Sequence, residues 1–339
     1  MKAVALTRYL PISDPASLVD LDLPKPEATG HDLLVRIEAI SVNPVDAKVR
    51  SPKATVEEKP RVLGWDAAGV VEAVGPDVTR FEPGDEVFYA GDITRPGSNA
   101  QFQLVDERIV GHKPSSLSFA ESAALPLTSI TAWEALFERL HIDRGGDHRD
   151  ESLLIIGGAG GVGSIAIQLA KMAGLTVITT ASRPESRQWV LDLGADHVLD
   201  HREPLAPQLD SLGIKDVAFI ANFSDTDAYW KTMAELIRPQ GHIVSIVENK
   251  NPLDLNLLKS KSATFAWEFM FTRSMFKTPD LDAQADLLDN IATLIDGKKL
   301  RTTVGEIVSP INAENLRAAH AKLESARTIG KLILSGWPG

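Results

Sequence analysis

A glycine-rich turn is the first feature of this sequence that could bind a ligand. Residues 153–170 carry no charge, and five of these eighteen residues are glycine, which disfavours a membrane-spanning helix because each interior glycine costs about 1 kcal/mol. Gly158, Gly160 and Gly163 are spaced G-x-G-x-x-G between a short apolar strand pattern and a helical pattern. Such glycines permit a tight turn, the approach of a pyrophosphate to the backbone, and close helix packing. We therefore predict a dinucleotide site at Gly158, Ala159, Gly160, Gly161, Val162 and Gly163.

The residues after the next predicted strand indicate which dinucleotide binds. An NAD site usually places an acid about 20 residues beyond the glycine motif, where it binds the ribose 2′-hydroxyl. Here that strand runs into VITTASRPESR, and no acid appears before Glu185. Ser182, Arg183 and Arg187 carry a hydroxyl and two guanidinium groups that suit a 2′-phosphate. This pattern predicts NADPH as the cofactor, with a solvated loop bearing surface arginines as the alternative.

Several catalytic devices are excluded by the residue types present. The chain has no cysteine, which removes thiolate nucleophiles and cysteine-ligated zinc sites. Its eight histidines include one H-x-x-x-H spacing, His197 and His201, and these two residues flank the strand pattern at 198–200 rather than share a predicted helix. The three tyrosines are followed four residues later by serine, isoleucine and methionine, so a Tyr-x-x-x-Lys pair is absent. Covalent catalysis through cysteine and this tyrosine–lysine chemistry are therefore both ruled out.

Composition and charge limit the possible partners. The 339 residues are 44% hydrophobic and 24% charged, which is the composition of a globular protein large enough for two domains. A net charge of -11 argues against binding nucleic acid or an anionic membrane through a broad surface. The apolar run at the N-terminus is too short for a signal peptide. We expect a soluble, cytoplasmic protein.

The elements that must position these residues change in character along the chain. Up to about residue 125 the sequence reads as β-rich, with short alternating runs broken by turn clusters. From there a helical pattern in SITAWEALFERL leads into strand patterns at 153–156, 176–180, 198–200, 217–221 and 242–247, separated by helices or loops. The tail returns to a mixed pattern, with helices near 281–296 and after Asn312 and strands near 303–308 and in KLILS. The alternation predicts an α/β protein with a doubly wound parallel sheet.

Six further segments follow one another along the chain: SVNPVDAKVR, LGWDAAGVVEAVGPDVTRFEPGDEVF, ESAALPLTSITAWEAL, GGAGGVGSIAIQLAKMAG, LGADHVLDHRE and the terminal GKLIL. Together and in this order they resemble the medium-chain dehydrogenase/reductase superfamily, and within it most closely the zinc-free quinone oxidoreductase branch. The resemblance implies a GroES-like, β-rich catalytic domain over residues 1–124 and 270–339. It implies a Rossmann dinucleotide-binding domain over residues 125–269, inserted between these two parts.

The resemblance also indicates that no zinc is bound. Zinc alcohol dehydrogenases of this superfamily carry a Gly-His-Glu triplet where this chain has Gly64, Trp65 and Asp66, and a cysteine near Asn43. The lobe with four closely spaced cysteines is replaced by the short GDITRPGSNAQFQL. Tetrahedral zinc needs three protein ligands, so Asp66 alone is expected to be a solvated or hydrogen-bonded carboxylate.

Further site residues are implied by position in the family pattern. Asn43 in Asn-Pro-Val-Asp is expected to face the nicotinamide and the acceptor, with a turn before Pro44 as the alternative. Thr131 is expected at the nicotinamide, with a helix-capping or core role as the alternative. Trp65, Phe269 and Phe271 are candidate walls of the acceptor pocket, each with core packing as the alternative. His201 in LGADHVLDHRE and Asn222, at the C-terminal end of a predicted strand, are candidate cofactor contacts.

These expectations favour hydride transfer to an acceptor that is already electron-poor. Without a Lewis acid, an alkoxide forming from an alcohol has nothing to stabilise it. A quinone or an α,β-unsaturated carbonyl instead needs mainly orientation beside NADPH. The alternatives are an NADPH-binding protein with a structural or regulatory role, and a zinc-type alcohol dehydrogenase. The segment TFAWEFMFTRSMF is expected to supply a strand that pairs across a homodimer and then a flexible wall over the acceptor.

Overall fold

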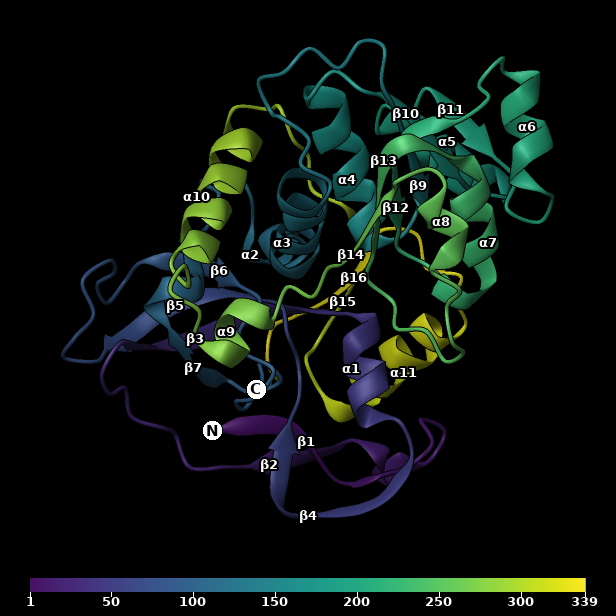
Figure 1. The fold of residues 1–339 in the computed structure, drawn as a ribbon. Helices are drawn as coiled ribbons and strands as arrows, with labels where there is room; N and C mark the ends of the chain where they lie inside the picture. Colours follow the sequence, from purple (N-terminus) through teal and green to yellow (C-terminus); the bar gives the residue numbers. More distant parts are fainter. Residues whose placement is uncertain (339) are drawn as a thin grey trace. The chain divides into compact units, whose positions relative to one another are not determined.

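The fold is described from a computed structural model that covers residues 1–338. Over these residues the chain forms two compact units, which we describe separately (Figure 1). Unit 1 joins Met1–Ile130 with the chain from Phe271 onward, and unit 2 is Thr131–Met270. That the two units serve as a catalytic and a dinucleotide-binding domain stays a prediction.

Unit 2 contains, over the described residues, a six-stranded sheet in which all neighbouring strands are parallel. Its order is β11-β10-β9-β12-β13-β14, so the first strand along the chain lies in the middle and the chain winds outward in both directions. This is the strand order of a dinucleotide-binding fold, and it confirms the predicted doubly wound sheet. The strands are β9 (Ser152–Ile156), β10 (Thr176–Thr180), β11 (His197–Leu199), β12 (Val217–Asn222), β13 (Ile237–Ser245) and β14 (Thr264–Trp267).

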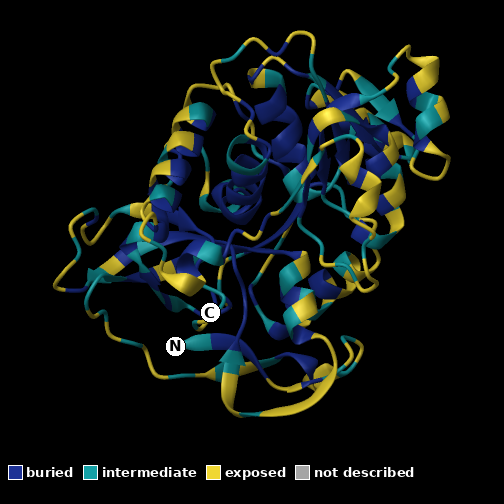
Figure 2. Cartoon of the chain, in the orientation of Figure 1, coloured by how far each residue is buried: buried dark blue, intermediate teal, exposed yellow. Residues whose placement is uncertain are grey.

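Helices connect these strands and cover the sheet. The first of them packs against β9 and β10 and buries every residue from Ser164 to Ala170, which explains the apolar composition of this stretch. Figure 2 shows the central strands of the sheet as buried. The helices are α4 (Gly161–Met172), α5 (Pro184–Asp192), α6 (Leu205–Ser211), α7 (Thr226–Leu236) and α8 (Asn256–Lys259).

Unit 1 is built from two mostly antiparallel sheets. The smaller sheet has the order β2-β1-β4, and the larger one β15-β16-β3-β5-β6-β8 with β7 paired to β3. The C-terminal strand β16 runs antiparallel to β3 with Leu332 opposite Val42, so Lys331 comes next to the end of β3. The strands are β1 (Lys2–Tyr9), β2 (Val19–Asp22), β3 (Asp32–Val42), β4 (Lys53–Val62), β5 (Ala67–Val74), β6 (Glu86–Tyr89), β7 (Phe102–Asp106), β8 (Val110–His112), β15 (Val304–Val308) and β16 (Lys331–Ser335).

The helices of unit 1 are short except for two near the C-terminus. Asn312 accepts a hydrogen bond from the backbone N–H of Asn315 at 2.8 Å and so begins the last helix, as the sequence predicts. Among residues 1–338 no helix is both long and apolar enough to span a membrane. The helices are α1 (Pro44–Arg50), α2 (Phe119–Ala123), α9 (Thr272–Phe276), α10 (Ala283–Asp296) and α11 (Ala313–Glu324), with 3₁₀ helices at Pro15–Ser17 and Glu107–Ile109.

Two segments differ from the sequence-based expectation. The helical pattern in SITAWEALFERL becomes α3 (Pro126–Trp133), which continues as a π-helix over Glu134–Arg139. The strand expected in the first half of TFAWEFMFTRSMF is β14, and its second half forms the short helix α9. That this second half is a flexible wall over the acceptor stays a prediction. β14 is an edge strand of the sheet, and pairing of two copies along it stays a prediction.

Candidate functional site

The glycine-rich turn joins β9 to the N-terminus of α4. A Cβ atom on Gly158 would lie 1.9 Å from Oγ1 of Thr179, and one on Gly163 would lie 2.4 Å from the carbonyl oxygen of Gly157. The fold itself therefore requires glycine at both positions. Gly160 is different, because its backbone is extended (φ −75°, ψ 173°) and a Cβ there would meet nothing closer than the Gly157 carbonyl oxygen at 3.6 Å.

The space in front of Gly160 suits a pyrophosphate. Gly160 precedes the first turn of α4, where the N–H groups lack partners within the helix and the helix dipole favours an anion. Ala159 lies in the turn, while Gly161 and Val162 open the helix. The three glycines of the motif therefore have the properties expected of a dinucleotide-binding turn: Gly158 and Gly163 are tightly packed, and the backbone at Gly160 is open.

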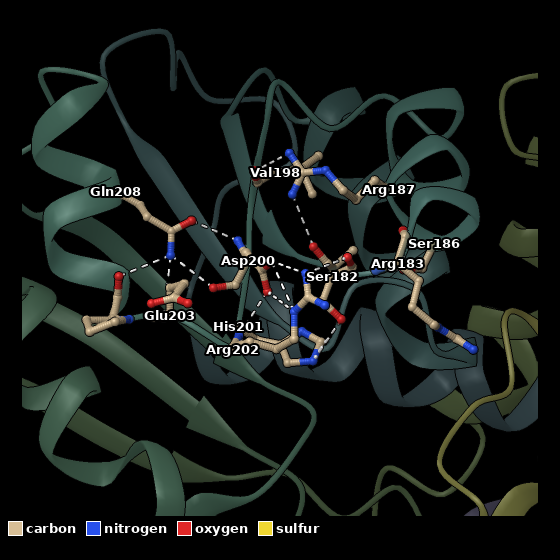
Figure 3. A network of polar contacts seen from close by, with 12 residues as sticks. Ser182, Arg183, Ser186, Arg187, Val198, Asp200, His201, Arg202, Glu203 and Gln208 are labelled. Atoms are coloured by element: carbon tan, nitrogen blue, oxygen red, sulfur yellow. Dashed lines mark hydrogen bonds and ion pairs between the residues drawn. The ribbon is translucent and has the colours of Figure 1, made fainter.

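A polar cluster lies where β10 and β11 end, at the carboxyl edge of the parallel sheet (Figure 3). Oγ of Ser182 lies 3.3 Å from Nε2 of His201, and the Arg202 guanidinium donates to the Ser182 carbonyl oxygen at 3.2 Å. Arg202 also binds both carboxylate oxygens of Asp200, and this hydrogen bonding holds the pKa of Asp200 well below its usual range. The negative charge of Asp200 is thus balanced by Arg202. The hydroxyl of Ser182, the imidazole of His201 and the guanidinium of Arg202 lie together at this edge of the sheet.

The two arginines predicted for the 2′-phosphate are placed differently. The Arg187 guanidinium donates to the carbonyl oxygens of Ala181 and Val198 at 3.2 and 3.1 Å, so it ties the ends of β10 and β11 together. These bonds direct part of its guanidinium into the fold, and contact of Arg187 with a phosphate stays a prediction. Arg183 begins α5, and Figure 3 shows its side chain directed away from the cluster around Arg202. Contact of Arg183 with a ligand stays a prediction.

Asn222 ends β12 at the same edge, as the sequence indicates, but its side chain is fully buried. Its amide nitrogen donates to the hydroxyls of Ser245 at 3.1 Å and Thr226 at 3.3 Å, and its oxygen accepts from the Ser224 N–H at 3.1 Å. Because both polar atoms of the Asn222 amide are hydrogen-bonded within the fold, the predicted contact of this side chain with the cofactor is not supported.

Unit 1 contains a second polar group of a different kind, which we call the Lys331 cluster: Asn43, Asp46, Asp66 and Lys331, all at most 3% exposed. The Lys331 ammonium donates to the Val42 carbonyl oxygen at 3.1 Å, to Oδ2 of Asp66 at 2.9 Å and to Oδ1 of Asn43. Asp66 also accepts from the Asn43 amide and, through Oδ1, from the Leu127 N–H at 2.8 Å at the start of α3. The cluster therefore joins β3, β16 and α3.

The acids of the Lys331 cluster carry strongly altered proton affinities. Burial raises the pKa of Asp46 to about 7, although the Asn43 N–H, 2.5 Å from its carboxylate, and the charge of Lys331 act in the opposite direction. Burial also raises the pKa of Asp66, opposed chiefly by Lys331. With Lys331 and Asp66 as the ion pair, a neutral Asp46 near pH 7 keeps the buried charge balanced.

The residues of this cluster do not fit a zinc ion. Zinc in proteins is held mainly by cysteine and histidine, with carboxylates as further ligands. Trp65, beside the cluster, has no lone pair to donate, and Asn43 and Val42 offer only neutral oxygens. The Asp66 carboxylate is already paired with the Lys331 ammonium, and the Asp46 carboxyl accepts the Asn43 N–H. Within residues 1–338 no group of three or more histidine, aspartate or glutamate side chains is arranged to hold a metal.

Most of the predicted catalytic and pocket residues are enclosed within the unit to which they belong. The Asn43 amide donates to Asp66 at 2.8 Å and to the Trp65 carbonyl oxygen at 3.2 Å and is 1% exposed, so the predicted hydrogen bond to an acceptor is not supported. Trp65 and Phe271 are also 1% exposed and pack edge to face at 6.2 Å, which supports the core alternative for both. Thr131 on α3 is 5% exposed, and its nicotinamide contact stays a prediction.

Phe269, in unit 2, differs from these residues. It is 46% exposed, and its place in an acceptor pocket stays a prediction.

Two functional candidates, Lys331 and Arg202, were not predicted from the sequence. Arg202 carried a usable signal, because it follows the predicted strand at 198–200 and ligands bind at the carboxyl ends of such strands. No sequence pattern beyond its position in GKLIL indicates a role for Lys331, because its partners Asn43 and Asp66 lie far away in the sequence.

Comparison with known proteins agrees with this architecture. Residues 29–132 match the family model of the alcohol dehydrogenase GroES-like domain, and residues 193–334 match that of zinc-binding dehydrogenases. A zinc-type alcohol dehydrogenase-like protein of Staphylococcus aureus is 48% identical over 312 residues, which are 92% of each chain. A solved Rhizobium etli structure whose description includes zinc-dependent alcohol dehydrogenase is 52% identical, with a TM-score of 0.95 over 100% of this chain and 99% of that one. A Pseudomonas syringae quinone oxidoreductase is 29% identical, with a TM-score of 0.81 over 98% of this chain and 99% of that one.

The fold and the glycine turn thus define an oxidoreductase with a pyridine nucleotide-binding fold. The chain belongs to the medium-chain dehydrogenase/reductase superfamily. The sheets of unit 1 are its GroES-like part, and the parallel sheet of unit 2 is its Rossmann-like part, as predicted.

Proposed function

We propose that this protein is an NADPH-dependent oxidoreductase that transfers hydride to a quinone or an α,β-unsaturated carbonyl without using zinc. The observation that carries the proposal is the Lys331 cluster. Asn43, Asp66 and the neighbouring Trp65 stand where the family resemblance places metal ligands, and the Lys331 ammonium binds Asn43 and Asp66. Because residues 1–338 offer no set of metal ligands, no bound metal would act as a Lewis acid on an alkoxide, which disfavours simple alcohols as substrates. The Pseudomonas relative named quinone oxidoreductase is consistent with this acceptor class.

The chain's own contribution is binding and orientation. Bound NADPH would supply a hydride to an electron-poor carbon of the acceptor. A quinone gains that hydride and one proton from solvent and becomes a hydroquinone, while NADPH becomes NADP⁺. The open backbone at Gly160 would hold the pyrophosphate, and the edge formed by Ser182, His201 and Arg202 would hold the 2′-phosphate. The direct test is NADPH oxidation by the purified protein with quinone, enone and alcohol substrates side by side.

Arg202→Ala should weaken NADPH binding about tenfold and leave NADH binding unchanged within about threefold. The reason is that Arg202 is the guanidinium that the structure places beside Ser182 and His201, and only NADPH carries the 2′-phosphate. The dissociation constants of both cofactors would be measured by titration of intrinsic tryptophan fluorescence.

A matched control and a second variant sharpen this test. Arg149 is an exposed arginine of unit 2 that pairs with Asp147, as Arg202 pairs with Asp200, so Arg149→Ala should leave both constants unchanged. Arg183→Ala measures whether that side chain also takes part. Equal affinities of the wild-type protein for NADPH and NADH would contradict the assignment of a 2′-phosphate site.

A further inference from the structure

We propose that the Lys331 ammonium is a built-in cation that occupies the Asn43–Asp66 site in place of a metal ion and acts as a positioning residue by holding Asp66 against the start of α3. Its catalytic consequence rests on the function proposed above. The structural part, a buried cation that closes the site to metals, stands on the geometry alone.

The surroundings of the ammonium match its chemistry. Lys331 is 3% exposed, and its three N–H donors meet three oxygens: the Val42 carbonyl, Oδ1 of Asn43 and Oδ2 of Asp66. A carbonyl, an amide oxygen and one carboxylate form the acceptor set that an ammonium prefers, whereas zinc takes thiolate and imidazole ligands. The site is therefore built for the lysine.

The charges in the Lys331 cluster exclude a metal ion while the lysine is in place. A buried ammonium is costly unless it is paired, and the fully buried Asp66 supplies the opposite charge at 2.9 Å. A divalent ion bound to the same oxygens would lie a few ångströms from the ammonium and be repelled at low dielectric. While Lys331 keeps its place, Asp66 is not available as a metal ligand.

The other carboxylate oxygen of Asp66, Oδ1, connects the Lys331 cluster to α3, the helix that carries the predicted nicotinamide contact Thr131. It accepts the Leu127 N–H at 2.8 Å, at the second residue of α3, and the same helix carries Thr131. Without the ammonium, a fully buried Asp66 would bind a proton or turn away from this N–H. The N-terminus of α3 would then lose the Asp66 carboxylate that caps it. We expect the residues that follow in the helix, Thr131 among them, to be displaced. We therefore expect turnover to suffer more than cofactor affinity, because the glycine turn is held by other contacts.

Chemical rescue of Lys331→Ala tests the proposal. The variant should lower kcat about ten- to hundredfold with NADPH affinity within about threefold, and should lower Tm by roughly 5–15 °C. Added n-propylammonium chloride should restore part of both, because it returns three N–H donors to the vacated space. Tetramethylammonium chloride at equal concentration has no N–H donor and should restore neither. Lys322→Ala, which removes an exposed lysine of unit 1 paired with Glu306, is the matched control and should change nothing.

A double variant keeps the test decisive if Lys331→Ala does not fold. Lys331→Met combined with Asp66→Asn removes both charges and should be more stable than Lys331→Met alone, because no unpaired buried carboxylate remains. A double variant less stable than the single one would contradict the charge pairing. Three other results would overturn the proposal. The two ammonium salts could rescue Lys331→Ala equally, Lys331→Ala could keep the kcat and Tm of the wild type, or the wild-type protein could bind zinc stoichiometrically. Failure of the wild-type protein to oxidise NADPH would refute only the proposed function, since the Tm rescue and the zinc titration decide on Lys331 without it.

Discussion

Gly160→Ala should raise the dissociation constant for NADPH about a hundredfold while the protein still folds. The local structure tolerates a side chain here, because the backbone is extended and a Cβ would lie 3.6 Å from its nearest neighbour. A methyl group would instead occupy the space that a pyrophosphate needs to reach the N–H groups of the first turn of α4. Loss of charge-assisted hydrogen bonds of this kind explains the size of the effect.

Two comparisons show whether the loss belongs to the ligand. Gly145 lies in an exposed loop where a Cβ would meet only Oδ1 of Asp143 at 3.9 Å, so Gly145→Ala should leave the constant unchanged. The Tm of Gly160→Ala should stay within about 5 °C of the wild type, because replacing glycine before a helix costs about 1 kcal/mol. NADPH affinity that is retained in Gly160→Ala would show that no pyrophosphate lies at this turn.

Asp46→Asn should change how stability depends on pH. Burial raises the pKa of Asp46 from its ordinary value near 4 to about 7. The folded state therefore binds the proton more tightly than the unfolded chain does, and the stability gained from it is complete below about pH 4 and lost as pH rises through about 7. Between pH 5 and pH 8 the wild-type protein should lose about 3 kcal/mol of stability through this group, or roughly 5–10 °C in Tm.

Asparagine mimics the neutral acid and can still accept the Asn43 N–H, so the variant should lack this loss. Thermal unfolding of both proteins at pH 5 and pH 8 measures the difference, which should favour the variant at pH 8 and shrink at pH 5. Asp77→Asn, at an exposed aspartate of unit 1, should follow the wild type at both values. Parallel curves for Asp46→Asn and the wild type would show that Asp46 is ionised throughout.

Much of the fold could be predicted because its signals are local. The buried parallel strands of unit 2 are short apolar runs between turn residues, and the glycine motif marks the first crossover. β4 was missed because Lys53–Val62 is largely exposed and rich in charge, so it shows no alternating pattern. α1 was missed because it has only seven residues, and its start is fixed by contacts between Asn43 and Asp46 rather than by periodicity.

The site could be predicted only in part because side-chain direction depends on distant partners. Arg187 and Asn222 were found as suitable residue types at the right sheet edge, but their polar groups are used inside the fold. Asn43 was found through its motif, and its amide is bound by residues that lie 23 and 288 positions away. Lys331 reads as an ordinary strand residue until β16 pairs with β3, which brings it beside Asn43 and Asp66.

The range of acceptors that the protein reduces shows whether it transfers hydride without a metal ion. Purified, chelator-treated protein would be assayed with NADPH and phenanthrenequinone, with NADPH and a short enone, and with NADP⁺ and a primary alcohol. We expect turnover with the quinone or the enone, negligible oxidation of the alcohol, and no increase in rate when zinc is added, because in the Lys331 cluster an ammonium already occupies the Asn43–Asp66 site. Robust alcohol oxidation that depends on zinc, with quinone and enone both unreduced, would contradict it.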